Sequence, residues 1–441
     1  MSAQTEIVQA QNEPDIPRWS LGLRIAFRFC FVYFGLYCVS TQIMGGLISI
    51  PKMEEIDPSS FWPIKQVTFW TAAHIFHAKL PLLYTDSGSG DKIFDWVLAF
   101  CLLVFAALTT TIWSALDRRR ENYVTFYKWF RLFIRFALAS QLIGYGMAKV
   151  VPLQMPGLRL TRLLTPYGNF SPMGVLWSSI GAAPAYEIFA GSAEMLGGIL
   201  LALPWTTTLG ALVCVADMTQ VFMLNMTYDV PVKLFSFHLL LMALFLLAPE
   251  FRRLTDFFLR NRTVAPSAQP QLFKTPRANR IAIAVQLVFG MWMIGTAVYG
   301  SWGNWYIYGG GRPKSPLYGI WIVDELSIDG QIRSPLLTDY DRWRRVIFDL
   351  PQGMAFQRMD DSIVGCTASI NVKDSTLVLK RSSDKNFNGN FTFERPAPDQ
   401  LILDGEIASH KMHMQLHLFD RSKFLLVNRG FHWIQEYPFN R

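Results

Sequence analysis

The chain has 441 residues, of which 51% are hydrophobic, 14% are aromatic and only 17% are charged, and its formal net charge is +8. Soluble domains carry roughly 25% charged residues, and burying a core does not require so few. Apolar runs close to the roughly 20 residues that cross a bilayer recur along the chain. The composition therefore excludes an ordinary soluble protein and predicts an integral membrane protein.

Seven apolar spans are predicted, at 25–49, 93–115, 129–150, 184–203, 206–226, 230–249 and 280–300. The segments on one side of these spans contain 15 Lys and Arg residues, and those on the other side contain six. Because positive charge is retained in the cytoplasm, the N-terminus is expected inside and the residues after 301 outside. Most of the +8 charge belongs to this orientation signal, so it gives no support to nucleic-acid binding.

The rest of the chain is organised around these spans. The expected parts are a disordered cytoplasmic tail (1–20), two spans with an outer amphipathic loop (21–127), a four-helix core (128–250), a basic cytoplasmic loop (251–279), a seventh span (280–300), a linker (301–317) and a β-barrel (318–441). Two segments of the outer loops, 69–77 and 171–177, are apolar and aromatic enough to form short helices at the membrane interface.

A period-two pattern begins at Tyr318. The candidate strands are 318–330, 343–350, 354–359, 365–372, 375–381, 388–395, 400–407, 411–419 and 424–430. Turn residues separate several of them. Eight or nine short strands with no obvious helix predict a closed up-and-down barrel.

Polar and charged side chains inside the predicted spans are costly in lipid and indicate functional sites. They come from four consecutive spans, namely Gln141, Tyr145 and Lys149; Glu187 and Glu194; Asp217 and Asn225; and Asp229, Lys233 and His238. In one bundle these groups would converge. The alternative is that they only join helices, and Asp229 with Lys233, four residues apart, could form a local pair.

Two groups of histidines are candidate metal ligands. His74 and His77 have a metal-compatible spacing but no adjacent third ligand, and an aromatic interfacial helix is the alternative. In the last clear strand His413 and His417 alternate onto one face. With His410 they could bind a metal or a haem, but the polar face of a barrel strand is the simpler interpretation. We therefore predict no metal site.

Two family resemblances follow from these motifs. Arg135–Lys149 and the Glu194-Met195-Leu196-Gly197-Gly198 run resemble the first two helices of the DoxX family, and residues 206–249 would match its third and fourth helices. Ser171–Gly174 and Tyr228–Lys233 resemble the longer bacterial members of that family. This resemblance implies a location in the bacterial inner membrane and quinone-linked redox chemistry with a protein partner.

The C-terminal barrel resembles a lipocalin, because Gly319-Ile320-Trp321 begins its first strand and Arg429 lies near its end. In lipocalins such a tryptophan packs against such an arginine at the barrel base. A helix usually follows the last strand in that family. The resemblance implies a small apolar ligand held inside the barrel.

The leading hypothesis is a DoxX-like protein that binds a quinone, an isoprenoid or another lipid in an outward-opening polar pocket formed by the third to sixth spans. Lys149 and Lys233 would hydrogen-bond a carbonyl, and Glu194 or Asp217 would transfer protons. The catalytic candidates are Glu194, Asp217, Lys233 and His238, and the ligand-binding candidates are Gln141, Tyr145, Lys149, Glu187, Asn225 and Asp229. The alternative is a non-enzymatic lipid carrier, cargo receptor or assembly chaperone that recognises its partner through the barrel.

Overall fold

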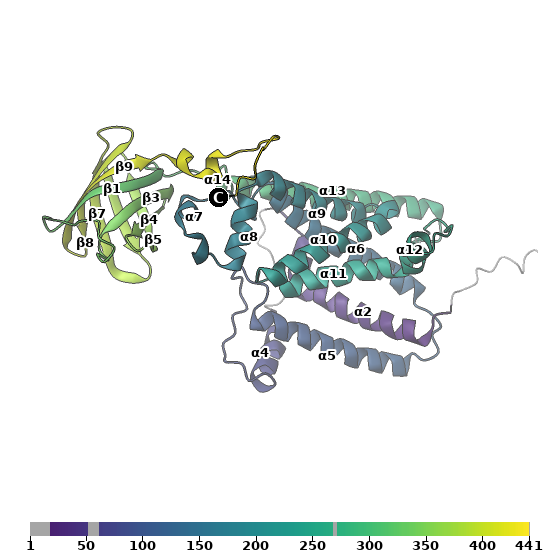
Figure 1. The fold of residues 1–441 in the computed structure, drawn as a ribbon. Helices are drawn as coiled ribbons and strands as arrows, with labels where there is room; N and C mark the ends of the chain where they lie inside the picture. The colour runs from purple at the N-terminus through teal and green to yellow at the C-terminus, as the bar shows by residue number, and fades with distance from the viewer. Residues whose placement is uncertain (1–17, 52–60, 268–270, 441) are drawn as a thin grey trace, which may run out of the picture. The chain divides into compact units, whose positions relative to one another are not determined.

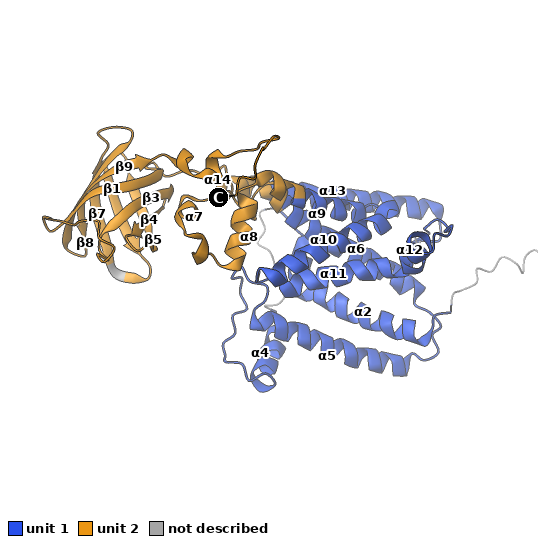
Figure 2. Ribbon diagram, in the orientation of Figure 1, with its two compact units in different colours: residues 1–147, 190–300 blue, residues 148–189, 301–441 orange. Residues whose placement is uncertain are grey.

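Two compact units make up the chain in the computed structural model, which describes residues 18–51, 61–267 and 271–440 (Figure 1). We call residues 1–147 and 190–300 the helical unit, and residues 148–189 and 301–441 the barrel unit (Figure 2). Nearly all of the predicted tail, 1–20, lies outside the described residues.

The described helices match most of the predicted ones. They are α2 Leu21–Ser40, α3 Gln42–Leu47, α4 Ile64–His74, α5 Ile93–Leu116, α6 Val124–Val150, α7 Leu160–Leu164, α8 Pro172–Gly181, α9 Pro184–Ala202, α10 Thr207–Thr227, α11 Lys233–Leu247, α12 Phe251–Phe258, α13 Pro276–Ile307 and α14 Leu425–Asn428. Six segments among them are long and apolar enough to cross a membrane, namely Leu21–Ser40, Ile93–Leu116, Pro184–Ala202, Pro204–Thr227, Lys233–Phe258 and Pro276–Ile307. The chain is therefore a multi-pass membrane protein, as predicted.

Helix α6, the predicted third span, differs from these six. Its 27 residues are enough to cross a bilayer, but they include four basic side chains. Residues 134–143 are buried on every face of the helix. A helix buried all round is surrounded by protein, so its composition does not have to match lipid.

Small residues let α6 and α9 approach closely. A Cβ on Gly146 would lie 2.8 Å from the Gly191 carbonyl oxygen, and one on Gly198 would lie 3.0 Å from that of Ala139. Backbone contact of this kind is typical of helix packing in membranes. The glycines that carry the DoxX resemblance therefore have a packing role in this chain.

The two loops that are predicted to lie on the outer side contain the expected short helices. The described part of the first loop forms α4, which overlaps the predicted helix at 69–77. In the second loop α8 begins after Ser171, whose hydroxyl accepts a hydrogen bond from the Gly174 N–H. Serine followed by proline is a favourable helix start, because proline has no N–H that needs a partner.

The barrel unit contains a closed antiparallel barrel. Its strands are β1 Gly319–Ile328, β2 Gln331–Ile332, β3 Trp343–Leu350, β4 Gly353–Arg358, β5 Ile363–Asn371, β6 Thr376–Arg381, β7 Asp384–Glu394, β8 Gln400–Ile407 and β9 His410–Phe419. Sequential neighbours pair from β3 to β9, and β1 pairs with both β3 and β9, so eight strands close the barrel. The two-residue β2 extends β1 by a hairpin. The predicted up-and-down barrel is confirmed.

One predicted strand, 424–430, is wrong. Leu425–Asn428 forms the short helix α14 instead, after a turn in which the Asp420 carboxylate accepts hydrogen bonds from Ser422. The segment has only one β-branched residue, and leucine favours helix. A strand is also not needed there, because β9 already closes the barrel on β1.

Apolar side chains fill the described interior of the barrel. Leu326, Leu377 and Met414 expose none of their surface. In β9 the burial alternates, with methionine and leucine inward and His413, Gln415 and His417 outward, as predicted. The interior is a packed core, as in other small barrels.

Helix α7 packs on the barrel at a small second core. Leu160 contacts a cluster made with Ile320, Ile347 and Ala355. The predicted contact of Trp321 with Arg429 is wrong, because the guanidinium carbon of Arg395 lies 5.6 Å from the centre of the Trp321 ring. Arg429 instead donates hydrogen bonds to His432 and Gln435.

Candidate functional site

A cavity of about 520 Å³ lies in the helical unit, and we call it the α2–α11 cavity. Its walls come from the end of α2, from α3, from the loop 84–92 with the start of α5, and from the start of α11. Helix α6 contributes Tyr145. Apolar and aromatic side chains such as Tyr37, Leu98 and Phe235 alternate with polar ones. The cavity is therefore a candidate ligand site.

A break in the first predicted span shapes one wall. The sequence predicts a continuous span over 25–49, but α2 ends at Ser40 and Thr41 is extended, with φ −124° and ψ 176°. Helix α3 then begins at Gln42, whose amide donates a 2.7 Å hydrogen bond to the Tyr145 hydroxyl. The break thus places a side-chain amide in the cavity wall.

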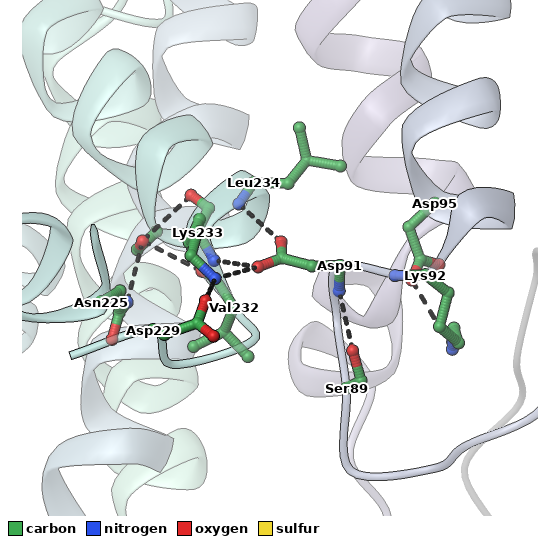
Figure 3. A network of polar contacts seen from close by, with 10 residues as sticks. Ser89, Asp91, Lys92, Asp95, Asn225, Asp229, Val232, Lys233 and Leu234 are labelled. Atoms are coloured by element: carbon green, nitrogen blue, oxygen red, sulfur yellow. Dashed lines mark hydrogen bonds and ion pairs between the residues drawn. The ribbon is translucent and has the colours of Figure 1, made fainter. Parts of the chain in front are cut away.

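The loop 84–92 is fastened to the first turn of α11 by Asp91 (Figure 3). One Asp91 oxygen accepts from the Lys233 N–H and the other from the Leu234 N–H, both at 2.9 Å. The Lys233 ammonium lies 3.7 Å from Asp91 and 2.8 Å from Asp229. Asp91 therefore satisfies free donors at a helix N-terminus, where negative charge is favourable.

Replacing Asp91 by alanine is expected to lower the free energy of unfolding by about 1–2 kcal/mol, the usual cost of losing a helix cap. The loop should also become sensitive to protease, because the carboxylate fastens it to α11. Thermal unfolding of the purified protein in mild detergent and limited proteolysis measure the two effects. The control is Asp86→Ala, an exposed aspartate of the same loop whose partner within the described ranges is the nearby Gly88 N–H. Equal behaviour of the two variants would contradict the role of Asp91.

His238 lies behind the cavity wall and is 3% exposed. Its ring stacks on Tyr37, with centroids 3.8 Å apart and an interplanar angle of 5°. Nδ1 must donate to the Leu234 carbonyl oxygen at 2.7 Å, so Nε2 accepts from the Tyr33 hydroxyl at 2.8 Å. Both ring nitrogens are thus occupied, and His238 is linked to the cavity lining through Tyr37 and Leu234.

The other predicted site residues fall into separate environments. Asn225 donates to the Ser236 hydroxyl and ties α10 to α11. Gln141 packs against Gly46, where a Cβ would lie too close to its amide nitrogen. Glu194 is 2% exposed, and Asp217 is half-buried on α10. None of these four is among the residues described as lining the cavity.

Glu187 and Lys149 belong to the barrel unit. The Glu187 carboxylate is fully buried and accepts a 2.9 Å hydrogen bond from the Met155 N–H. The positive charge of Lys149 acts on it as well. The predicted set is therefore divided between the two units, and the other eight residues lie in the helical unit.

The α2–α11 cavity differs from the predicted pocket in its walls. The prediction used the third to sixth spans, but α9 and α10 contribute none of the described lining residues. Sequence reasoning missed Tyr37, Gln42 and Asp91. The loop that contains Asp91 is rich in Ser, Gly and Asp, which indicates only a turn. Its contact with Lys233 spans 142 positions of sequence.

No family model and no solved structure match the chain. It is 30% identical over 138 residues to the uncharacterized protein YwoB of Bacillus subtilis strain 168, in a match that covers 29% of this chain and 79% of YwoB. The chain belongs to the family of YwoB. That relative is described only as uncharacterized, so a function for this YwoB family member has to be argued from its own residues.

In this YwoB family member, four of the candidate metal-binding histidines have hydrogen-bond partners within the protein, namely His74, His410, His413 and His417. His74 bonds to the Trp70 carbonyl oxygen and stacks on the Trp70 ring. On the barrel exterior three histidines each pair with an aspartate, namely His410 with Asp329, His413 with Asp404 and His417 with Asp324. The hydrogen bond from His410 holds the pKa of Asp329 below its usual range. Within the described ranges, no group of three or more His, Cys, Asp or Glu residues could hold a metal ion.

Proposed function

We propose that this chain is a DoxX-like protein of the bacterial inner membrane that binds a quinone, an isoprenoid or another lipid in the α2–α11 cavity. The observation that carries the proposal is the cavity itself, whose volume of about 520 Å³ suits a small ligand. Ligand sites typically measure roughly 300–1,000 Å³ and combine an apolar lining with a few polar groups. The cavity has both features.

The predicted topology supports an outward-opening site. The cavity lies at the end of the helical unit where α2 ends and where α5 and α11 begin. With the N-terminus in the cytoplasm, this end faces the outer side of the membrane. A lipid-soluble ligand would then enter from the outer leaflet, and the barrel unit would also lie on the outer side.

The polar groups of the cavity suit a ligand that carries carbonyl oxygens. A carbonyl oxygen accepts hydrogen bonds, and the Gln42 amide has a second N–H besides the one that bonds to Tyr145. Lys92 also lines the cavity, and its ammonium has a third N–H besides those directed at the Thr85 carbonyl oxygen and the Asp95 carboxylate. Tyr37 lines the cavity too, with its ring already stacked on His238. We therefore assign the carbonyl-binding role to Gln42 and Lys92 in place of Lys149 and Lys233.

The redox part of the proposal needs a partner. Reduction of a quinone consumes two electrons and two protons, and we assign the electron supply to a redox protein that docks on this chain. All five cysteines are free thiols, in keeping with electrons arriving from elsewhere. The proton-transfer roles of Glu194 and Asp217 stay predictions, to be tested by Glu194→Gln and Asp217→Asn in an assay with that partner.

The cavity assignment predicts that the purified full-length protein carries a quinone or an isoprenoid that organic solvent extracts and mass spectrometry identifies. Binding of decylubiquinone, followed by quenching of protein fluorescence, should weaken roughly threefold to tenfold in Gln42→Leu, the usual effect of losing one hydrogen bond. The control is Gln220→Leu, an exposed glutamine of α10 outside the cavity lining. If no such lipid is recovered and Gln42→Leu binds like the control, the proposal is wrong.

The alternative function is a carrier or chaperone that holds its cargo in the barrel. The packed interior of the described barrel argues against an apolar ligand inside it, because Val346, Phe348 and Leu401 expose none of their surface. Recognition would have to use the outer face of the barrel. Recovery of a phospholipid or a polypeptide, rather than a quinone or an isoprenoid, would favour this alternative.

A further inference from the structure

A second cavity of the helical unit lies where α6 and α13 begin, and it is strongly basic. Its volume is about 200 Å³, and it is lined by Lys128, Arg131 and Arg135 of α6, together with Asn279 and Gln286 of α13. The three cations are spaced by three and four residues, so they lie on one face of α6. None of the described residues that line it carries a carboxylate.

The arginines of this cavity are buried. Arg131 is 7% exposed and Arg135 is 6% exposed. The Arg135 guanidinium is held by neutral partners, since it donates to the Gln286 side-chain oxygen and, at 3.5 Å, to the Thr207 hydroxyl. Its Nε has no hydrogen-bond partner among the described residues. A buried cation held by neutral groups is costly unless an anion accompanies it.

An apolar groove adjoins the basic cavity. It has a volume of about 460 Å³ and is lined by α3, α6 and α13, with Phe133, Phe136, Phe289 and Trp292 among its residues. Leu132 lines both the groove and the basic cavity. A site for a charged group therefore lies next to a site for a hydrocarbon chain.

We propose that these two sites together bind an anionic phospholipid, with its phosphate in the basic cavity and an acyl chain in the groove. Arginine suits a phosphate because its planar fork donates two hydrogen bonds at once. The cavity could hold roughly seven water molecules at about 30 Å³ each, which is enough for a phosphate with some water. The groove accounts for the hydrocarbon, which a soluble phosphate does not have.

The basic cavity is separate from the α2–α11 cavity, although α3 contributes to the walls of that cavity and of the groove. It lies at the other end of α6, which the predicted topology puts at the cytoplasmic side. Anionic lipids are attracted to basic pockets between helices on that side. Helices α6 and α13 already contact each other through Phe136 and Phe289, whose ring centroids are 5.2 Å apart. A lipid bound between these two helices would strengthen that contact.

The test uses the full-length protein in mild detergent and measures the thermal midpoint as phosphatidylglycerol, phosphatidylcholine or inorganic phosphate is added. Phosphatidylglycerol should raise the midpoint of the wild type, and neither other probe should match it. Arg135→Gln should weaken the phosphatidylglycerol effect at least tenfold in concentration, because charge-assisted hydrogen bonds are lost. The control Arg252→Gln removes the same charge from a side chain that is 93% exposed, and should behave as wild type.

Two further variants keep the test decisive if Arg135→Gln does not fold. Lys128→Gln removes a half-buried cation from the cavity, and Trp292→Ala shortens the groove without changing charge. Both should weaken phosphatidylglycerol binding. If inorganic phosphate raises the thermal midpoint as much as phosphatidylglycerol does, and Trp292→Ala behaves as wild type, the proposal is overturned and the ligand is a soluble anion. An equal response to phosphatidylcholine would mean that only lipid in general is required, and would overturn the proposal.

Discussion

Replacing Tyr123 by phenylalanine is expected to destabilise the helical unit by about 1.5–3 kcal/mol, the usual value of hydrogen bonds to a charged group, although only one hydroxyl is lost. Arg28 of α2 is 1% exposed, and its Nε and Nη2 both donate to the Tyr123 hydroxyl, at 2.8 and 2.6 Å. The same guanidinium donates to the Ser114 hydroxyl and to the Asp117 carbonyl oxygen. Without Tyr123 Oη, a buried cation loses two of its four acceptor contacts.

The measurement is the midpoint of unfolding in mild detergent. Tyr127→Phe is the matched control, because it makes the same change four residues away and its hydroxyl takes no part in the Arg28 network. The double variant Arg28→Met/Tyr123→Phe should recover part of the lost stability, since the cation is removed together with its partner. If the double variant is less stable than Tyr123→Phe alone, the penalty does not come from the buried charge.

The same hydroxyl gives the helical unit part of its pH dependence. Tyr123 donates a 2.7 Å hydrogen bond to the Asp117 carboxylate, which holds the pKa of Asp117 below its usual range. A lowered pKa contributes stability above the unfolded value of about 3.9, and that contribution is lost as the pH falls through the lowered value. The Tyr123→Phe variant should therefore lose less stability on acidification than the wild type.

Patterns of single residues predicted the elements of this fold well. Hydropathy located six spans that the structure confirms, and alternation located eight of its strands, with 343–350 and 400–407 matching β3 and β8 at both ends. These patterns depend only on the local period of the sequence, so they can be read without knowing which other segments pack against an element. The failures arose where another part of the chain decides the outcome. The local sequence does not exclude a strand at 424–430; it is excluded because β9 already closes the barrel on β1.

The candidate site was harder to predict because it depends on contacts distant in sequence. The intramembrane charge rule identified Lys233, and the spacing rule identified its pair with Asp229. Asp91 could not be found in this way, because a loop aspartate carries no local signal of the helix it caps. In the same way, Trp321 was recognised by resemblance, but Arg395 rather than Arg429 lies over its ring. The family resemblance therefore predicted that an arginine packs on Trp321, but not which arginine does so.

Gly405 of β8 gives the largest effect expected in the barrel unit. It lies directly opposite Phe391 of β7. A Cβ at this position would be 2.1 Å from the Asn390 carbonyl oxygen and 2.7 Å from the Phe391 Cα. Both are backbone atoms, which cannot move aside as a side chain would, so the strands would have to separate. Glycine inside a strand commonly marks such a close approach.

The variant Gly405→Ala is therefore expected to lower the free energy of unfolding by about 1–3 kcal/mol or more, the range typical of overpacking. It should also open the pairing of β7 with β8. Hydrogen exchange of the full-length protein should show lost protection at Asn390 and Thr392, whose backbone faces β8. This follows because Asn388, two residues earlier, accepts from the Ala408 N–H, while the Phe393 N–H bonds to Ser375 on the β6 side. The matched control is Gly365→Ala in β5, where a Cβ would meet no atom within 4 Å. Alanine there should be neutral or slightly stabilising, because it also reduces the freedom of the unfolded chain. Equal exchange in both variants would mean that the close approach of β7 and β8 is not needed to keep the barrel closed.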